Sequence, residues 1–266
     1  MKTLLATSII LASTSAFSHD ASFSTDSCNV DLDGGISISH DTLSFTEHQK
    51  TLYKIVNNND LYIDNEKISL NNDQQALVTQ YSNSIRTIVP EVKNIALDAM
   101  DLAVDGVNLA FNELLGEGNE VGGQLTTELG KLRSEIKVKF DENETITFDE
   151  NGFDGDKFFG EEFEQRIESL VETTIQNSMG SLLIAVGQEM LFSGGDTNAL
   201  ETRMEEFGET IEHEMESRGE KIEQRAEALC SSVSQINDIE EQLKLSIELL
   251  SDTNFLTVNV KNKSSI

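Results

Sequence analysis

The chain has 266 residues and carries 48 acidic against 19 basic side chains, a formal net charge of −29 at pH 7. This charge repels nucleic acid and anionic membrane surfaces, so both are excluded as partners. With 38% hydrophobic residues the chain can still bury a sizeable core, and its length suits one large domain or two small ones.

Residues 1–18 have the pattern of a secretory signal peptide. Lys2 precedes an apolar run from Leu4 to Ala12, and small residues then lead to a predicted cleavage site near Ser18. The run is shorter than the roughly 20 apolar residues that span a bilayer, and no later segment reaches that length without charges. The sequence therefore predicts an exported chain that has no transmembrane segment.

Two cysteines remain after this segment. Cys28 lies near the predicted mature start and Cys230 near the end, and in an exported chain we predict that they form a disulfide. Closing a loop of about 200 residues removes, in the chain-entropy model, on the order of 5 kcal/mol of unfolded-state freedom. The bond would also pack the N-terminal segment against the late helices. A pair of free, buried thiols is the alternative.

Residues 19–72 are predicted to form an antiparallel β-meander. Apolar and polar residues alternate in short runs such as CNVDL, GISIS and LYKIV, which are separated by clusters of glycine, aspartate and asparagine. Asp64 and Asn65 are residue types that tolerate positive φ. We therefore expect a turn there that pairs residues 61–63 with residues 67–70.

Residues 73–250 are predicted to be mainly helical, because the apolar spacing changes to three and four residues. Asn72 or Asp73 should cap the first helix. Pro90 is expected in the first turn of a second helix, where its missing N–H costs nothing. The stretch GEGNEVGG, residues 116–123, predicts a break between helices rather than a phosphate-binding loop, because it follows a helix and lacks the glycine spacing of such loops.

One inserted β-hairpin is predicted at about residues 135–148. EIKVKF and ETITF alternate like strands, and the Asp-Glu-Asn between them suits a turn. Residues 251–266 are assigned to a C-terminal tail. The predicted fold class is α+β: an N-terminal antiparallel β-meander followed by long, partly coiled-coil-like helices with one inserted hairpin.

Three later helices follow, from about Lys157, from about Thr197 to Cys230, and across residues 236–250. The predicted buried side of the first consists of Phe163, Ile167, Leu170, Val171, Ile175, Leu182 and Val186. The second carries an apolar stripe amid many glutamates, made of Met204, Phe207, Ile211, Met215 and Ile222. This spacing is compatible with a helical hairpin or short coiled coil. The methionines are predicted to be core, and an adaptable client-binding face is the alternative.

The stretch DENGFDGDKFFGEEFE, residues 149–164, resembles a calcium loop. With Gly155 in the sixth place, Asp154 and Glu161 fit the fifth and twelfth places of an EF-hand. Gly152 stands in the third place, however, where it offers no side-chain oxygen, and the preceding segment reads as a strand. We interpret the stretch as a strand-to-helix turn whose last glutamates favour the positive end of the helix, and we predict no metal site.

Other motifs are incomplete. His213 opens a stretch that is similar to the zinc motif HExxH, but Ser217 stands where the second histidine should be. No GxSxG elbow is present to supply a serine nucleophile. The sequence therefore predicts no catalytic residues and no cofactor.

Several stretches together carry a family resemblance. They are the signal peptide, the early Cys28, the run LYIDNEKISLNNDQQALVTQYSNSIRTIVP, the stretch NSMGSLL at residues 177–183 and a late ALC at residues 228–230. The chain resembles, over residues 27–235, the YggN-like family of proteobacterial periplasmic proteins, a domain of unknown function. The resemblance implies a Gram-negative periplasmic location and a β-meander followed by long helices, and it brings no active site. The acidic loop at residues 149–156 and the tail depart from the pattern.

We therefore predict a non-enzymatic interaction or envelope-maintenance protein whose acidic helices present a surface to a protein partner in the periplasm. The alternatives are an acidic protein that binds divalent cations, or a hydrolase whose site is too dispersed to recognise. An open apolar groove would favour the interaction protein, whereas a cleft of converging polar groups would favour the hydrolase.

Overall fold

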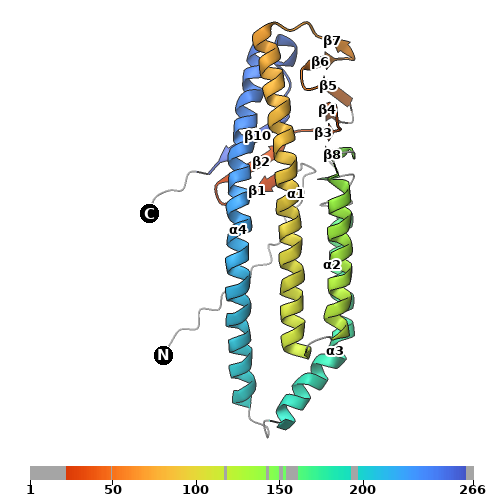
Figure 1. Cartoon of the computed structure of the whole chain (residues 1–266), viewed down its shortest axis with the longest axis vertical. Coiled ribbons are helices and arrows are strands. Elements are labelled where there is room, and N and C mark those ends of the chain that lie inside the picture. Colours follow the sequence, from red (N-terminus) through yellow and green to blue (C-terminus); the bar gives the residue numbers. More distant parts are fainter. Residues whose placement is uncertain are drawn as a thin grey trace.

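The computed structural model describes residues 22–48, 50–116, 119–141, 144–149, 152–153, 161–192 and 197–261. Figure 1 shows a long molecule in which the strands gather at the upper end and four long helices run down from them. We call the described residues within 22–92, 136–153 and 229–261 the head. The rest, residues 93–135, 161–192 and 197–228, is the stalk. The architecture is α+β, as predicted.

The larger sheet is antiparallel and has the strand order β7-β6-β5-β4-β3-β8-β9. Its strands are β3 (Gly35–Ile38), β4 (Thr42–Glu47), β5 (Lys50–Val56), β6 (Asp60–Ile63), β7 (Glu66–Lys67), β8 (Ile146–Asp149) and β9 (Gly152–Phe153). The meander from β3 to β7 is confirmed. So is the turn between β6 and β7, where Asp64 and Asn65 take positive φ values of 50° and 64°.

A second, smaller sheet corrects two predictions. It contains β1 (Ser22–Ser24), β2 (Cys28–Leu32) and β10 (Leu256–Val260), with β2 in the middle. The run CNVDL therefore does not belong to the meander. The assignment of residues 251–266 to a tail is also wrong for β10, which pairs with β2 along its whole length. Its sequence LTVNV alternates like a strand, and its Leu256 is buried in the core.

The predicted hairpin exists, but farther along the chain. Residues 135–139 are helical and end α2 (Glu120–Lys139). EIKVKF alternates like a strand, but its apolar residues also fit a helical spacing. Ile136 and Phe140 continue the buried row of Leu129 and Leu132 at steps of three and four residues, and this spacing determines the structure. The second predicted strand is β8, which forms a hairpin with β9 and extends the meander by pairing with β3.

Helix α1 (Asn72–Leu115) runs without interruption through Pro90, so the predicted second helix start is wrong. The side chain of Pro90 is exposed, while Val89 and Val92 on either side pack against the core and hold the helix together. The N-cap is Asn71, one residue before the predicted pair. Asn71 and Gln74 form a capping box, in which each side chain accepts a hydrogen bond from the other residue's backbone N–H.

The break at GEGNEVGG is confirmed, because it separates α1 from α2. Asn119 caps α2 through a 2.7 Å hydrogen bond from the N–H of Gly122 to its Oδ1. Its amide Nδ2 donates in turn to the backbone oxygens of Phe111 and Gly116.

The other two long helices are α3 (Glu161–Phe192) and α4 (Thr197–Ser246), and α4 is one helix where two were predicted. A short 3-10 turn, η1 (Glu248–Leu250), follows it.

The head is closed around aromatic side chains. Phe45 stacks on Tyr53 with ring centroids 4.3 Å apart, and Phe255 meets it edge-on at 5.1 Å. Tyr81 of α1 and Ile239 of α4 are buried in the same cluster. The head therefore packs both sheets against one end of the α1–α4 pair, which positions the rest of those helices as the stalk.

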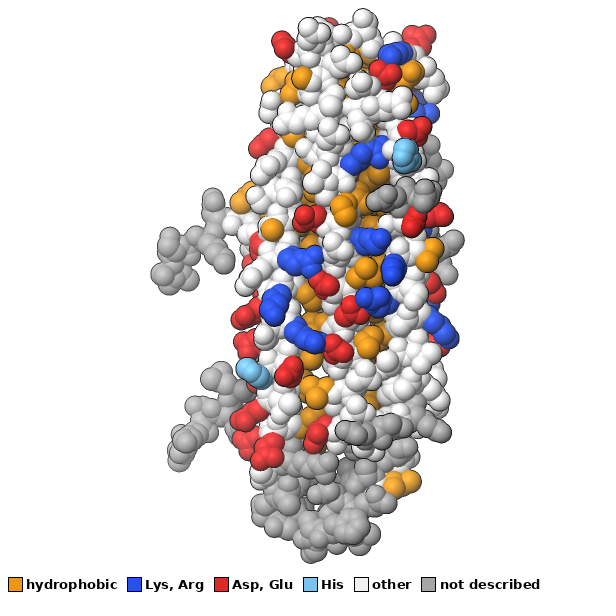
Figure 2. All heavy atoms as spheres, in the orientation of Figure 1, with side chains coloured by type: hydrophobic (Ala, Val, Ile, Leu, Met, Phe, Trp, Pro, Cys, Tyr) orange, Lys and Arg blue, Asp and Glu red, His pale blue; other side chains and the backbone are white. Residues whose placement is uncertain are grey.

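The stalk has a thinner core. Among its described side chains, the buried apolar ones are Leu125, Leu129 and Leu132 of α2, against which half-buried residues of α1 and α3 pack. Figure 2 shows hydrophobic side chains in the seams between the helices, bordered by acidic and basic groups. Three of these groups on α1 make ion pairs: Asp98 with Arg225, Asp101 with Arg133, and Asp105 with Arg218.

These pairs connect α1 to a neighbour on each side and set the register of the three helices. Arg133 of α2 donates two hydrogen bonds to Asp101, at 2.6 and 2.9 Å. These bonds hold the pKa of Asp101 below its usual value. Exposed pairs of this kind contribute roughly 0–1 kcal/mol each to the free energy of unfolding. They therefore help to align the helices of the stalk more than they stabilise it.

Candidate interaction surface

Helix α3 turns small polar residues inward. Thr174 and Ser178 are 8% and 2% exposed, and each hydroxyl donates to a carbonyl of its own helix, at 2.7 Å to Leu170 and 3.0 Å to Ile175. These bonds satisfy the hydroxyl groups without any contribution from another element. A helix that packs on one face ordinarily places its large apolar residues there.

Several large apolar residues of α3 instead face outward. Val171, Ile175, Met179 and Leu183 recur every four residues and are 43%, 53%, 58% and 73% exposed. Residues four apart lie on neighbouring turns of the same face, so these side chains form one continuous strip that we call the α3 apolar row. Ile184 beside it is also exposed.

This arrangement contradicts part of the predicted buried side of the helix. Ile167 and Leu170 pack on the leucines of α2 as expected. Val171 and Ile175 do not, because the inward position one step around the helix is taken by Thr174 and Ser178. Phe163, Leu182 and Val186, also predicted on that side, have side chains outside the described set.

A row of acidic and polar residues borders the α3 apolar row. Glu168, Glu172 and Gln176 also recur every four residues and are exposed. At about 100° per residue, this row lies about 60° around the helix from the apolar one. The buried row of Thr174 and Ser178 lies on the opposite side. The apolar row therefore separates the packed face of α3 from an acidic face.

The lower end of α4 adds to this acidity. Figure 1 shows α3 and α4 extending past the lower ends of α1 and α2. In this part of α4 five glutamates have exposed side chains: Glu201, Glu205, Glu206, Glu209 and Glu212. Met204 stands among them with an exposed side chain, whereas Met215 farther along is half-buried against Gly106 of α1. Of the two open alternatives for the methionines, core fits Met215 and an accessible face fits Met204.

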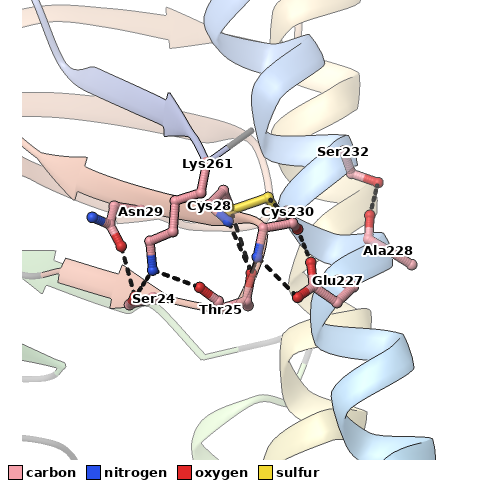
Figure 3. The surroundings of a disulfide bond; sticks show 10 residues. Ser24, Thr25, Cys28, Asn29, Glu227, Ala228, Cys230, Ser232 and Lys261 are labelled. Atoms are coloured by element: carbon pink, nitrogen blue, oxygen red, sulfur yellow. Dashed lines mark hydrogen bonds between the residues drawn. A yellow bond between two sulfur atoms is a disulfide. The ribbon is translucent and has the colours of Figure 1, made fainter. Parts of the chain in front are cut away.

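The two cysteines hold the head together. The structure pairs Cys28 of β2 with Cys230 of α4 in a disulfide, as predicted (Figure 3). Glu227, one turn before Cys230, accepts a hydrogen bond from the N–H of Ser27 at 3.1 Å. From the C-terminal side, the Lys261 ammonium donates to the backbone oxygen of Thr25 at 2.8 Å. The bond lies in a tightly hydrogen-bonded junction of both chain ends, which indicates a structural role.

A buried carboxyl group in the head was not anticipated from the sequence. Glu240 of α4 is 2% exposed, and its Oε1 accepts a 2.7 Å hydrogen bond from the N–H of Phe255, while Oε2 has no partner in the described part of the chain. Burial raises the pKa of Glu240 to about 7, although the Phe255 amide and Lys244 oppose this rise. Burial also raises the pKa of Tyr53 and Tyr81 nearby.

One signal in the sequence points to this group. Glu240 lies four residues after Ile236 and three before Leu243, so it falls on the apolar stripe of its helix. Its partner is the backbone amide of Phe255, 15 residues later in the chain and directly before β10. The carboxyl thus ties α4 to the strand that completes the small sheet.

A shallow hollow of about 350 Å³ lies over β5 and β6, lined by Lys50, Thr51, Tyr53, Lys54, Tyr62, Asp64 and Asn65. The Lys54 ammonium is 3.4 Å from Oδ1 of Asn65. This lining includes neither a histidine nor a cysteine.

The other motifs from the sequence are not assembled into a site. His213 and Ser217 both lie exposed on α4. Of the calcium-like stretch, Asp154 and Gly155 fall outside the described residues, and Glu161 is the first residue of α3. Among the described residues, no group of three or more histidine, cysteine, aspartate or glutamate side chains is placed to hold a metal ion.

No described helix is both long and apolar enough to cross a membrane. In a comparison with protein families, a model described as a protein of unknown function (DUF2884) matches residues 28–256. No curated protein and no solved structure matches the chain.

Proposed function

Since the chain belongs to this family of proteins of unknown function (DUF2884), we propose from its structure that it is a non-enzymatic interaction protein that docks a partner on the α3 apolar row. The observation that carries the proposal is the packing of the middle of α3, which buries Thr174 and Ser178 and leaves Ile175 and Met179 exposed. A helix face of this kind is stabilised when a partner covers it.

The α3 apolar row can supply part of the free energy of binding. Full burial of a Val, Leu, Ile or Met side chain contributes about 1.5–3 kcal/mol relative to full exposure. The four residues of the α3 apolar row are roughly half exposed, so covering them supplies several kcal/mol of apolar burial by the same measure. This gain is comparable to the lower end of the cost of immobilising a partner, roughly 4–15 kcal/mol, so contacts beyond the row must supply the net affinity of a reversible complex.

We place this function in the periplasm of a Gram-negative bacterium and regard the chain as a YggN-like protein of proteobacterial type. The leader-like residues 1–18 support export, with cleavage near Ser18. The Cys28–Cys230 disulfide supports an oxidising compartment. Envelope maintenance is the role that fits a docking protein in that place.

Site-specific photo-crosslinking tests the proposal. A photoreactive side chain replaces Ile175 in one version of the full chain and Gln224 in the control. Gln224 is exposed on α4, away from the α3 apolar row. In the cells that encode the chain, we expect discrete cross-linked polypeptides from position 175 and none from position 224. Equal cross-linking from the two positions, or none from either, would overturn the proposal.

A further inference from the structure

The charges around the α3 apolar row identify the kind of partner that fits it. Glu168 and Glu172 run alongside the row, and the exposed glutamates near Met204 belong to the same end of the stalk. The described basic side chain nearest to this part of α3 in sequence is Arg166, which already donates to Glu135 of α2 at 3.4 Å. The surface is therefore apolar in its centre and acidic along its border.

This charge disfavours a second copy of the chain as the occupant. Each copy carries a formal net charge of −29. Pairing two copies through their apolar rows would bring two acidic surfaces together, and in a parallel pair Glu168 and Glu172 of one copy would lie near those of the other. Like charges juxtaposed in this way oppose association and select against the wrong partner.

The geometry of the row favours a helical occupant. The row from Val171 to Leu183 repeats every four residues, and at 1.5 Å per residue it extends for about 18 Å. Ridges with this spacing interdigitate with the same ridges of another helix, the commonest packing of helices in globular proteins. A partner helix of about four turns would cover the row.

We propose that the α3 apolar row binds a cationic amphipathic helix, whose apolar face covers Val171, Ile175 and Met179 and whose lysine or arginine side chains meet Glu168 and Glu172. The inference rests on the proposed docking function and adds the chemistry of the partner. Met179 and Met204 suit partners of differing shape, because the unbranched thioether side chain adapts to irregular surfaces.

The test uses the purified full chain and three labelled 18-residue peptides. The first has leucine and lysine in a helical amphipathic pattern, the second has glutamate in place of lysine, and the third has the lysine–leucine composition in an order without an apolar face. Fluorescence anisotropy is measured at low and high salt. We expect saturable binding of the first peptide alone, weakening with salt because exposed charges are screened.

Two variants locate the binding. Ile175→Ser with Met179→Ser should weaken the affinity by about tenfold or more, since an anchor lost from an interface costs at least about 1.4 kcal/mol. Glu168→Gln with Glu172→Gln should weaken it by roughly three- to tenfold at low salt and by less at high salt. The matched control is Glu220→Gln with Glu223→Gln, which removes the same charge from exposed positions on α4 instead of α3. It should change the affinity less than twofold.

Circular dichroism and thermal melting check that every variant is folded. Equal effects of the two glutamine variants would overturn the inference, because binding would then follow net charge alone. Binding of the glutamate peptide, or a dimer of the free protein in light scattering, would also overturn it. Absence of peptide binding together with cross-links at position 175 refutes the cationic partner and leaves the docking function standing; absence of both refutes both.

Discussion

The head and the stalk use the same two helices in opposite ways. In the head, α1 and α4 are covered by two sheets, and residues such as Leu43, Phe45 and Tyr81 are completely buried. In the stalk, the same helices expose or half-expose most of their described side chains. The comparison indicates that the head supplies most of the stability of the molecule, whereas the stalk supplies accessible apolar surface.

Spectroscopy can observe the two parts separately. The chain has no tryptophan and three tyrosines, Tyr53, Tyr62 and Tyr81, which all lie in the head. Tyrosine fluorescence therefore reports on the head, while far-ultraviolet circular dichroism reports mainly on the long helices. Each prediction below uses this difference.

Removal of the disulfide should have the largest effect. The Cys28–Cys230 bond joins residues 202 positions apart, and a loop of this length corresponds to as much as about 5 kcal/mol in the chain-entropy model. We expect the variant Cys28→Ser with Cys230→Ser to lose a large part of this free energy of unfolding, measured by tyrosine fluorescence in guanidinium chloride. Reduced wild-type protein is the control and should match the variant. Two thiols that alkylate in native, unreduced protein would contradict the bond itself.

Truncation of one aromatic residue in each part should give unequal losses. Phe45→Ala empties a completely buried site in the head and should lower the free energy of unfolding by about 3–5 kcal/mol. Phe111→Ala removes a half-buried ring from the stalk and should cost about 1–2 kcal/mol. Urea unfolding, followed by both signals, measures the two losses. Similar costs would show that the stalk is as tightly packed as the head and would remove the basis of the comparison.

Glu240→Gln should change the pH dependence of the head. A carboxyl whose pKa rises from 4.5 to about 7 on folding contributes stability that is fully present below pH 4.5 and lost as the pH rises through about 7. Above that pH the cost of the buried charge is on the order of 3 kcal/mol, and glutamine, which keeps the acceptor for Phe255, avoids it.

We therefore expect the variant to be more stable than the wild type at pH 8 and the difference to shrink toward pH 4.5. Tyrosine-monitored unfolding across this range measures it. The other acidic groups titrate equally in both proteins, so their effect cancels in the difference. A difference that is constant between pH 5 and pH 8 would mean that Glu240 does not titrate as the structure indicates.

Local signals in the sequence predicted local structure well. The turn at Asp64 and Asn65 and the break at GEGNEVGG depend on residue types whose backbone preferences act within a few residues. Predictions that depended on packing were less successful. In the sequence, Pro90 indicates the start of a helix, but the core contacts of Val89 and Val92 keep the helix continuous. EIKVKF alternates like a strand, although Ile136 continues a buried helical row.

The candidate surface had the same limitation. The sequence shows that α3 carries apolar residues at helical spacing, and either Val171 or Thr174 can face inward on that evidence. The positions of the helices that pack on α3 decide which row is covered. Glu240 was missed because its environment consists of Phe255 and the core aromatic residues, which come from other parts of the chain.

The pairing of β2 with β10 has a consequence for the order in which the molecule is assembled. Cys28 lies opposite Val260 in the small sheet, so almost the whole chain must be delivered before β2 acquires its second neighbour. The helices need only local contacts and can form as they emerge, whereas contacts between distant residues form slowly. Closure of the head therefore comes late in folding, and a chain interrupted before Leu256 leaves one edge of β2 without a neighbouring strand.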